Sequence, residues 1–522
     1  MLPLHLFAVL AVSALAAAQA PIVDLGYAQY QGSTSANITS FLGVRYAAAP
    51  LGDLRFRAPQ SPTHVDGVQP AITEPNECFQ AAAGTSAINP LEQRAEDAVT
   101  ASEDCLFLNV YYPSDSVGTP PSRLPTLVWI HGGGYIGGAA SSFNGGDIIK
   151  QSNNGVVVVL IQYRLGVFGF LPGASVKRDG ALNAGLLDQD FALRWVNRHI
   201  TKFGGDPTKV TIWGESAGAG SVLQHIIAHD GNTQPQLFRG AITSSTFLPS
   251  QYVFNDRVPE LLFSKVLAQT NCTTASNSMA CLRATSAATL ETVNTNLNGA
   301  GFFGTFTFVP VIDGDFITQS AISSFREGKV NGKALLAVTN AFEGTAFVNQ
   351  SAVITASKYS MGLFPKFGPA EEQRVGSLYA PLGNDLFQVN AVQGESIFIC
   401  PSYFVLQAFA GRSWKAEFAV PPALHGQDVA FYFPSTSPPS FNNQAFINAF
   451  AQSFTSFIIS LNPNVKVSTT ITPLWSPFNE GNTEMLFNRT VAGTPQVQPI
   501  RTNSALLARC SFWNGVGHLT GQ

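Results

Sequence analysis

The chain has 522 residues, a formal net charge of −4 and only 12% charged residues, against about 25% in soluble proteins generally. A weakly charged, slightly acidic chain has no electrostatic attraction for nucleic acid or for an anionic membrane, which excludes both as partners on charge grounds. The 39 phenylalanines favour a large apolar core and are numerous enough to line a large apolar pocket as well.

The first 20 residues resemble a secretory signal peptide. An apolar run ends in Ala-Gln-Ala at 18–20, a small-x-small cleavage site, so Pro21 would be the first mature residue. An N-terminal membrane anchor is the alternative, but the run is short for a bilayer, and polar residues interrupt the later apolar stretch 155–172. We therefore expect a secreted protein without a stable membrane anchor. Residues 21–522 would form a single domain, because no linker or repeat divides them.

Strand-like and helix-like runs alternate through the middle of the chain. Unbroken runs of Val, Ile and Leu predict strands buried on both faces, which is typical of a parallel sheet covered by helices. Helical spacing of apolar residues predicts a helix over 185–199. The predicted strands cover 124–130, 155–162, 210–213, 238–244 and 334–340. This order predicts an α/β fold, in which ligands bind at the carboxyl ends of the strands.

The segment 210–221 joins a strand to a helix-like run (217–228) through the pattern Gly-x-Ser-x-Gly. Gly214 and Gly218 flank Ser216 because a sharp strand-to-helix turn has no room for Cβ atoms there. With 46 glycines in the chain such a pattern can arise by chance, but the strand before it and the helix after it are what a nucleophile elbow requires. The sequence therefore predicts Ser216 as a nucleophile. The N–H of Ala217 would then face a developing oxyanion.

A serine nucleophile needs a base, usually a histidine that a carboxylate holds in place. Among the eight histidines, His425 lies in a loop well downstream of Ser216, as the order serine, acid, histidine of α/β-hydrolases requires. Between the two, an apolar strand leads directly to Glu343, which is the predicted acid. Asp313 and Asp315 are the competing carboxylates, but their Asp-Gly-Asp pattern is more simply a turn.

A glycine-rich loop, His131-Gly-Gly-Gly-Tyr135, follows the first of these predicted strands. Glycines let backbone N–H groups approach a substrate oxygen, so Gly133 and Gly134 are predicted as oxyanion-hole donors. Phosphate binding is the alternative, but neither a Walker pattern nor a dinucleotide fingerprint is present. The sequence therefore predicts no cofactor. Phenylalanines at 302, 303, 306 and 342 could line an acyl pocket, although a place in the core is the simpler expectation.

Six cysteines in an exported chain indicate disulfides, and no pair has zinc-finger spacing, so no metal site is expected. Cys272 with Cys281 would close a small surface loop, and Cys78 with Cys105 would close the loop 79–104. Whether the two remaining cysteines, Cys400 and Cys510, pair stays open. Four sequons are candidate glycosylation sites in a secreted chain: Asn37, Asn271, Asn349 and Asn488.

Several motifs, read in order, resemble the type-B carboxylesterase/lipase family, which also holds the cholinesterases, and in particular its secreted fungal members. Besides the glycine-rich loop and the Ser216 elbow, they are Phe41-Leu-Gly-Val-Arg-Tyr-Ala47, Leu54-Arg-Phe-Arg-Ala-Pro59, Glu103-Asp-Cys-Leu-Phe-Leu-Asn-Val-Tyr111, Tyr163-Arg-Leu-Gly166, Asn183-Ala-Gly-Leu-Leu-Asp-Gln-Asp190, Phe203-Gly-Gly-Asp-Pro207 and Pro310-Val-Ile-Asp-Gly-Asp315. The resemblance covers residues 26–425, with a weaker tail.

The resemblance implies an α/β-hydrolase fold with a large, mostly parallel sheet and insertions over the active site. It implies a triad of Ser216, Glu343 and His425, with Glu215 lining the pocket near the imidazole. It maps the oxyanion donors to Gly133, Gly134 and Ala217. The loop between Cys78 and Cys105 resembles the family's first disulfide loop, which forms a lid in its lipases. Here that loop is short and polar, and it carries Glu92, Arg94, Glu96 and Asp97.

The expected function is secreted hydrolysis of small apolar or lipid esters through an acyl-enzyme. One alternative is a triacylglycerol or sterol ester lipase with interfacial activation, which the short polar loop argues against. Another is a cholinesterase-like binding protein without activity, because some relatives have lost the triad. This chain keeps all three residue types. The sequence does not determine the acyl chain, the alcohol or the oligomeric state.

Overall fold

The computed structural model describes residues 20–86 and 101–522. The predicted leader, except Ala20, lies outside the described residues, and so do Glu92, Arg94, Glu96 and Asp97 of the Cys78–Cys105 loop. Within the described part of the chain, the strands form a main sheet of 11 strands and a separate sheet of three. The small sheet pairs β1 (Ile22–Asp24), β2 (Gln29–Gln31) and β5 (Val68–Pro70).

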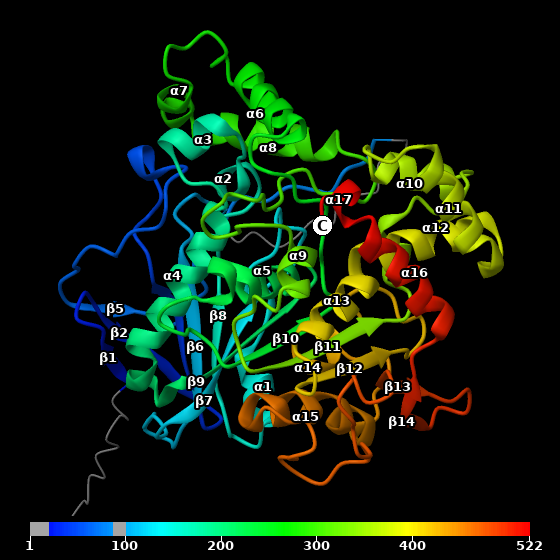
Figure 1. Ribbon diagram of the computed structural model, residues 1–522. Coiled ribbons are helices and arrows are strands. Elements are labelled where there is room, and N and C mark those ends of the chain that lie inside the picture. The colour runs from blue at the N-terminus through cyan, green and yellow to red at the C-terminus, as the bar shows by residue number, and fades with distance from the viewer. Residues whose placement is uncertain (1–19, 87–100) are drawn as a thin grey trace, which may run out of the picture.

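The main sheet has parallel strands at its centre and antiparallel strands at both edges (Figure 1). Its strands, in spatial order, are β14 (Pro495–Arg501), β13 (Thr483–Arg489), β12 (Ser413–Phe418), β11 (Ala334–Asn340), β10 (Gly240–Ser244), β9 (Gly205–Glu215), β7 (Leu124–Ile130), β8 (Val157–Ile161), β6 (Phe107–Pro113), β4 (Ile38–Arg45) and β3 (Ser33–Ser35). This is the α/β-hydrolase arrangement that the sequence predicts.

Successive side chains of the central strands enter two separate cores, one on each face of the sheet. Val128 and Ile130 of β7 belong to the larger core. Leu127 and Trp129, their neighbours in sequence, belong to the smaller one. Since side chains alternate along a strand, an unbroken apolar run buries both faces of the sheet. The runs that predicted these strands therefore also explain why helices must cover the sheet on both sides.

Helices cover each face of the main sheet. The smaller core packs the sheet against three helices: α1 (Gly145–Gln151), α14 (Val429–Tyr432) and α15 (Gln444–Ser460). The larger core packs it against α4 (Ala184–His199), α5 (Ala217–Gly231), α9 (Ala321–Arg326), α13 (Cys400–Ala408) and α16 (Ser504–Gly515). The remaining short helices beside these are α2 (Gly166–Phe170), α3 (Ala174–Asp179) and α17 (Gly517–Thr520).

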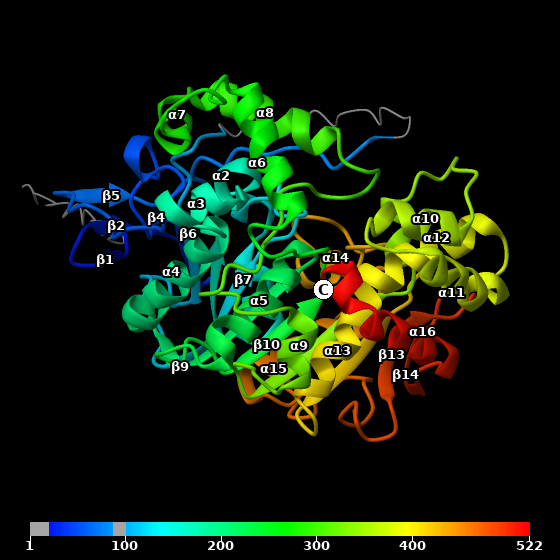
Figure 2. The same ribbon diagram turned by 45° about the horizontal axis from the view of Figure 1, so that its top comes forward.

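Two further groups of helices project from the sheet layers (Figures 1 and 2). The first group, here called the helical cap, consists of α6 (Arg257–Gln269), α7 (Ser278–Ala284) and α8 (Ala287–Gly299). The second group, here called the lateral helices, consists of α10 (Ala356–Leu363), α11 (Pro369–Tyr379) and α12 (Asp385–Gly394). Both groups are insertions between strands of the sheet, as expected for this fold.

Most predicted elements match the observed ones closely. The strand 124–130 and the strand 334–340 have the predicted bounds, and the predicted helix 185–199 begins one residue earlier. The predicted strand 210–213 is the end of a longer strand, β9. The predicted helix-like run 217–228 is helical except at its last residue. The backbones of Ala228, His229 and Asp230 have non-helical φ and ψ angles.

All three disulfides form: Cys78–Cys105, Cys272–Cys281 and Cys400–Cys510. The third answers the question that the sequence left open, and it ties α13 to α16 across 110 residues of sequence. The Cys272–Cys281 bridge lies within the helical cap. In the two described stretches of the chain, no helix is both long and apolar enough to cross a lipid bilayer.

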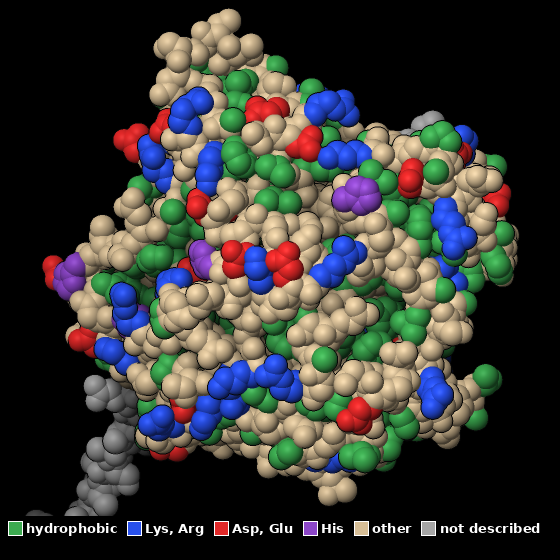
Figure 3. All heavy atoms as spheres, in the orientation of Figure 1, with side chains coloured by type: hydrophobic (Ala, Val, Ile, Leu, Met, Phe, Trp, Pro, Cys, Tyr) green, Lys and Arg blue, Asp and Glu red, His purple; other side chains and the backbone are tan. Residues whose placement is uncertain are grey.

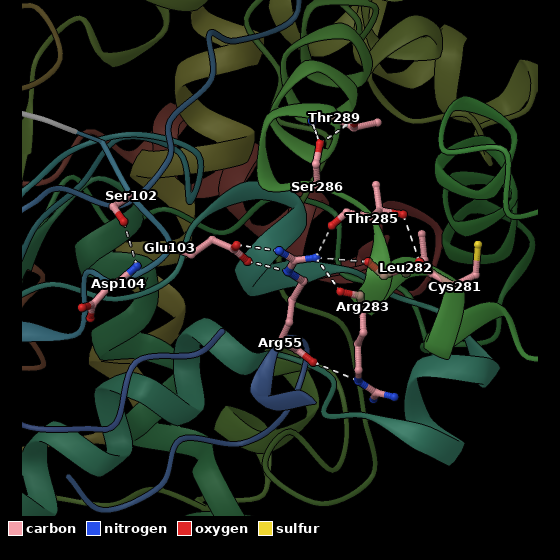
Figure 4. Close-up of polar contacts among 10 residues, drawn as sticks. All are labelled: Arg55, Ser102, Glu103, Asp104, Cys281, Leu282, Arg283, Thr285, Ser286 and Thr289. Atoms are coloured by element: carbon pink, nitrogen blue, oxygen red, sulfur yellow. Dashed lines mark hydrogen bonds and ion pairs between the residues drawn. The ribbon is translucent and has the colours of Figure 1, made fainter. Parts of the chain in front are cut away.

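Arg55 anchors the helical cap to the rest of the molecule (Figure 4). Its guanidinium forms a two-point ion pair with Glu103, with both N···O distances at 2.6 Å, and both side chains are buried. The remaining nitrogen, Nη1, donates to the backbone carbonyls of Leu282, Arg283 and Thr285 at the end of α7. Arg55 and Glu103 belong to two of the motifs that resemble the family. In this structure both residues serve to hold the helical cap in place.

The surface shown in Figure 3 carries acidic and basic side chains together, with apolar side chains between them. Many charged groups are paired, as in Lys329 with Glu327 and Arg194 with Asp190. This mixture agrees with the small net charge of the sequence.

Candidate active site

Ser216 occupies the sharp turn between β9 and α5. Its backbone has φ 55° and ψ −123°, a conformation that non-glycine residues rarely adopt. A Cβ on Gly214 would lie 2.3 Å from the backbone of Gly218, and a Cβ on Gly218 would lie 2.0 Å from the carbonyl oxygen of Ile130. Both glycines are therefore required by close packing, as the motif predicts. The strained turn presents Ser216 at the carboxyl end of β9.

Glu343 and His425 follow the neighbouring strands β11 and β12, whose carboxyl ends lie at the same edge of the sheet as that of β9. The two loops run side by side, since Phe342 N–H donates to the carbonyl of Ala423. This pairing brings Nδ1 of His425 to 2.6 Å from Oε2 of Glu343. Parallel strand order alone therefore gathers the three predicted residues at one edge.

The Glu343 carboxylate is buried, and both of its oxygens have partners. Oε1 accepts hydrogen bonds from the hydroxyl of Ser245 at 2.8 Å and from the backbone N–H of Asn340 at 2.7 Å. The side-chain amide of Asn340 in turn donates to Ser245 and to Asp428. No role for Ser245, Asn340 or Asp428 is predicted from the sequence. Their only signal was position, because each stands at the end of a strand or three residues after His425.

Glu215 lies beside the imidazole, as the family resemblance implies. Its Oε1 is 3.2 Å from Nε2 of His425, yet this oxygen has no hydrogen-bond partner among the described residues. Nε2 thus lies within ion-pair distance of the residue adjoining Ser216, although the two atoms do not form an aligned hydrogen bond. A base in that position must take a proton through Nε2, because Nδ1 is held by Glu343.

Two carboxylates and burial shift the pKa of His425 in opposite directions. Burial by itself lowers the pKa of the imidazole, but the negative charges of Glu215 and Glu343 outweigh it and raise the pKa to about 9. Burial raises the pKa of Glu215 to about 8. The Glu343 carboxylate, in direct contact with Nδ1, also stabilises the imidazolium and so raises the pKa of His425.

The glycine-rich loop after β7 lies against this edge. Gly133 and Gly134 have positive φ angles of 99° and 64°, and a Cβ on Gly132 would lie 3.0 Å from Cβ of Ser216. Within residues 20–86 and 101–522, the N–H groups of Gly133, Gly134 and Ala217 have no hydrogen-bond acceptor. Among the described residues, two amides of this loop and one of the elbow therefore have their donor capacity unused.

Aromatic rings enclose the imidazole. Phe398 lies 4.5 Å and Phe347 lies 4.8 Å from the ring of His425, measured between ring centroids. Phe398 comes from a single π-helical turn, Glu395–Ile399, between α12 and α13. Of the phenylalanines considered for an acyl pocket, Phe302 and Phe306 line an apolar cavity of about 370 Å³, whereas Phe342 is 46% exposed and packs on Phe387.

The competing carboxylate is structural. Oδ1 of Asp313 accepts hydrogen bonds from the backbone N–H groups of Asp315, Phe316 and Ile317, which is the turn that the sequence favours. Its Oδ2 accepts from the side chain of Asn183.

The predicted glycosylation sites fall into two kinds, since Asn37 and Asn271 are exposed and Asn349 and Asn488 are half-buried.

Comparison with known proteins agrees with this architecture. The sequence profile of the Carboxylesterase family matches residues 19–361. Lipase 2 of Geotrichum candidum is 30% identical over 90% of this chain and 92% of its own length. Carboxylesterase patB of Penicillium expansum is 30% identical over 96% of each chain. The crystal structure of Aspergillus niger EstA superposes with a TM-score of 0.86 at 30% identity, covering 96% of this chain and 99% of that one.

The fold and the strand-end site define an α/β-hydrolase. The chain belongs to the carboxylesterase family, in its type-B carboxylesterase/lipase branch. It is a carboxylic ester hydrolase.

Proposed function

We propose that the protein is a secreted serine esterase that hydrolyses apolar esters through Ser216, His425 and Glu343. The observation that carries the proposal is the 2.6 Å contact between Nδ1 of His425 and the buried Glu343 carboxylate, at the sheet edge where Ser216 stands in a strained turn. This contact fixes the tautomer in which Nε2 is free to accept a proton.

The reaction proceeds by acyl transfer. Nε2 of His425 takes the proton of Ser216 as the hydroxyl oxygen attacks the ester carbonyl, and Glu343 stabilises the imidazolium that forms. His425 then gives this proton to the departing alcohol oxygen. Water attacks the acyl-enzyme by the same route, releasing the acid and restoring the Ser216 hydroxyl.

Negative charge develops on the carbonyl oxygen in each tetrahedral intermediate. The N–H groups of Gly133, Gly134 and Ala217, which have no acceptor in the part of the chain that the structure describes, are the donors proposed for it. Ala217 is also the first residue of α5, where the helix dipole favours negative charge. Donors of this kind act strongly because they are in place before the charge appears, and each is typically worth about 10²–10³ in kcat.

Secretion is supported by the leader-like residues 1–20 and by the pairing of all six cysteines in three disulfides. The sequons at Asn37, Asn271, Asn349 and Asn488 would then be open to glycosylation, with the two exposed asparagines the best placed.

A lipase that acts on triacylglycerol or sterol esters is the second candidate function. The observation that favours it is an apolar cavity lined by Phe247 and Phe306, because Phe247 also packs on Phe398, which contacts the imidazole of His425. Comparing soluble with emulsified esters of the same acyl chain separates the two. A lipase with interfacial activation would gain activity when the substrate exceeds its solubility, and an esterase would not.

The triad is tested by Ser216→Ala, measured on a simple aryl ester. We expect kcat to fall about 10⁴–10⁶-fold, because removal of the nucleophile leaves only the oxyanion hole and binding. Ser221→Ala is a matched control, since Ser221 lies in α5, just beyond the turn, and contacts Gln189. Near wild-type kcat in Ser216→Ala would refute the assignment.

A further inference from the structure

The glycine-rich loop orients one of its proposed oxyanion donors from the carbonyl side of the same peptide unit. The carbonyl oxygen of Gly133 accepts hydrogen bonds from the backbone N–H groups of Ile136 at 3.0 Å and Gly137 at 2.9 Å. In a planar trans peptide the C=O and the N–H point in opposite directions. Because the Gly133 carbonyl is turned into the loop, the N–H of Gly134 is turned out of it. The direction of this donor therefore depends on where residues 136–138 lie.

Residues 136–138 are held by a segment from elsewhere in the sequence. The side-chain Oε1 of Gln80 accepts a hydrogen bond from the backbone N–H of Gly138 at 2.9 Å. The next residue, Ala81, donates its N–H to the carbonyl of Ile136 at 2.8 Å. Two successive residues of one segment thus fix both ends of the turn that follows the glycine-rich loop.

The amide of Gln80 has a fixed orientation because Glu77 lies beside it. Nε2 of Gln80 donates to Oε2 of Glu77 at 3.0 Å. Oε1 of Glu77 accepts from the hydroxyl of Ser141, in the short 3-10 helix Ala140–Ser142. An ionised carboxylate only accepts hydrogen bonds, so it requires the NH₂ group of the amide to face it. The amide oxygen must then face Gly138.

The same segment also holds the residues that precede Phe306. Gly84 exchanges two backbone hydrogen bonds with residues 304–305, each of 2.9 Å. The ring of Phe306 packs so closely on Gly134 that a Cβ there would lie 2.0 Å from it. Residues 80–84 therefore constrain the glycine-rich loop from two directions.

Resting on the proposed function, we propose that Gln80 is a positioning residue for the oxyanion hole. It acts through Gly138, which fixes the turn that orients the Gly134 N–H. A donor held in place before charge develops stabilises the transition state more than it stabilises the bound ester. Loss of the Gln80 acceptor should therefore lower kcat and leave KM almost unchanged.

The first test compares Gln80→Leu with Gln69→Leu in the full chain, on 4-nitrophenyl acetate. Leucine is close to glutamine in size and removes the acceptor of the Gly138 N–H. We expect kcat to fall about 10–100-fold with KM within about twofold, since a displaced donor costs no more than a missing one. Gln69 is the matched control, because its side chain bonds only to the nearby carbonyls of Asp66 and Gly67. Its kcat should not change.

A transition-state analogue separates positioning from a purely structural role. The Ser216 oxygen adds to the carbonyl carbon of a trifluoromethyl ketone, its proton passes to His425, and the ketone oxygen becomes an oxyanion. The Ki of this ketone should rise in Gln80→Leu by the factor by which kcat/KM falls. The Ki of the matching methyl ketone, which stays a neutral carbonyl, should not change. Unfolding of part of the sample would change neither Ki.

An exchange of the two polar side chains tests the orientation of the amide. Gln80→Glu places two carboxylates in contact, and Glu77→Gln removes the group that orients the amide, so each single variant should lose kcat. In Glu77→Gln/Gln80→Glu the amide at position 77 donates to the carboxylate at position 80, whose second oxygen accepts from Gly138. We expect this double variant to recover kcat to within about threefold of the wild type. If Gln80→Leu folds poorly, the exchange still decides the question.

Three results would overturn the role of Gln80. They are equal kcat in Gln80→Leu and Gln69→Leu, an unchanged Ki of the trifluoromethyl ketone, and a double variant no faster than Gln80→Glu. Failure of the proposed function has a different signature. In that case the wild-type chain hydrolyses no acetate ester, or Ser216→Ala hydrolyses it equally well. An enzyme that needs Ser216 and not Gln80 refutes only the inference about Gln80.

Discussion

The carboxyl edge of the sheet and the helical cap reach their shapes by different physical means. At the sheet edge, Glu343 is fixed by hydrogen bonds from Ser245, Asn340 and His425, all from neighbouring strand ends. The cap instead rests on Arg55 and on apolar packing, and a disulfide within it adds local constraint. Polar contacts at fixed distances suit proton transfer, whereas an apolar wall suits selection among chains. On the proposed function, the chemistry therefore depends on the polar contacts at the sheet edge rather than on the helical cap.

Among the changes that test this comparison of the sheet edge with the helical cap, the largest effect is expected where the polar network is broken at the acid. Glu343→Gln should lower kcat about 10³–10⁴-fold, because a neutral amide does not stabilise the imidazolium or hold the required tautomer. The measurement is kcat on a short aryl ester, with circular dichroism to show that the fold is intact. Asp313→Asn is the control, since this competing carboxylate serves a turn. An equal loss in both variants would contradict the assignment of Glu343.

A smaller effect is expected at the anchor of the helical cap. Arg55→Leu should lower the free energy of unfolding by about 3–5 kcal/mol, because it leaves the buried Glu103 carboxylate unpaired. Urea denaturation measures this loss. Arg57→Leu is a matched control, because the Arg57 side chain is 42% exposed and its pair with Asp179 spans 3.4 Å, so its loss should cost at most about 1 kcal/mol.

The kcat of Arg55→Leu tests whether the helical cap and the sheet edge act independently. If the cap is separable from the chemistry, the folded fraction of this variant keeps its kcat on a short ester. A loss of kcat on the acetate ester similar to that of Glu343→Gln would show that the cap supports the triad directly. Equal stability losses in Arg55→Leu and Arg57→Leu would show that the buried pair has no special weight.

The smallest effect is a shift of the pH profile. His425 must be neutral to accept the Ser216 proton, so kcat/KM should fall as the pH drops below its pKa, which nearby carboxylates raise to about 9. Glu215→Gln removes one negative charge and thereby lowers this pKa. The acidic limb of the kcat/KM profile should then move about one pH unit toward lower pH. A limb that moves upward, or not at all, would contradict a charge on Glu215 at these pH values.

The site illustrates which residues a sequence can reveal. Ser216 was accessible because its turn imposes glycines on both sides, and Glu343 because an apolar strand leads to it. Ser245 and Asn340 were not accessible, since a serine or an asparagine at a strand end has many uses. Phe306 illustrates the same limit. Its ring lies against the glycine-rich loop because it packs on Gly134, which is far away in sequence.

The parallel α/β architecture, the elbow, the glycine-rich loop and the order of the three triad candidates can all be predicted from the sequence. These features depend on local rules, namely buried strands, tight turns and chain order. Three features become visible only in the folded chain: the Cys400–Cys510 pairing, the contacts of two carboxylates with His425 and the cavity between α6 and α10. Those depend on distances between segments far apart in the chain, which are fixed only when the helices pack against the sheet.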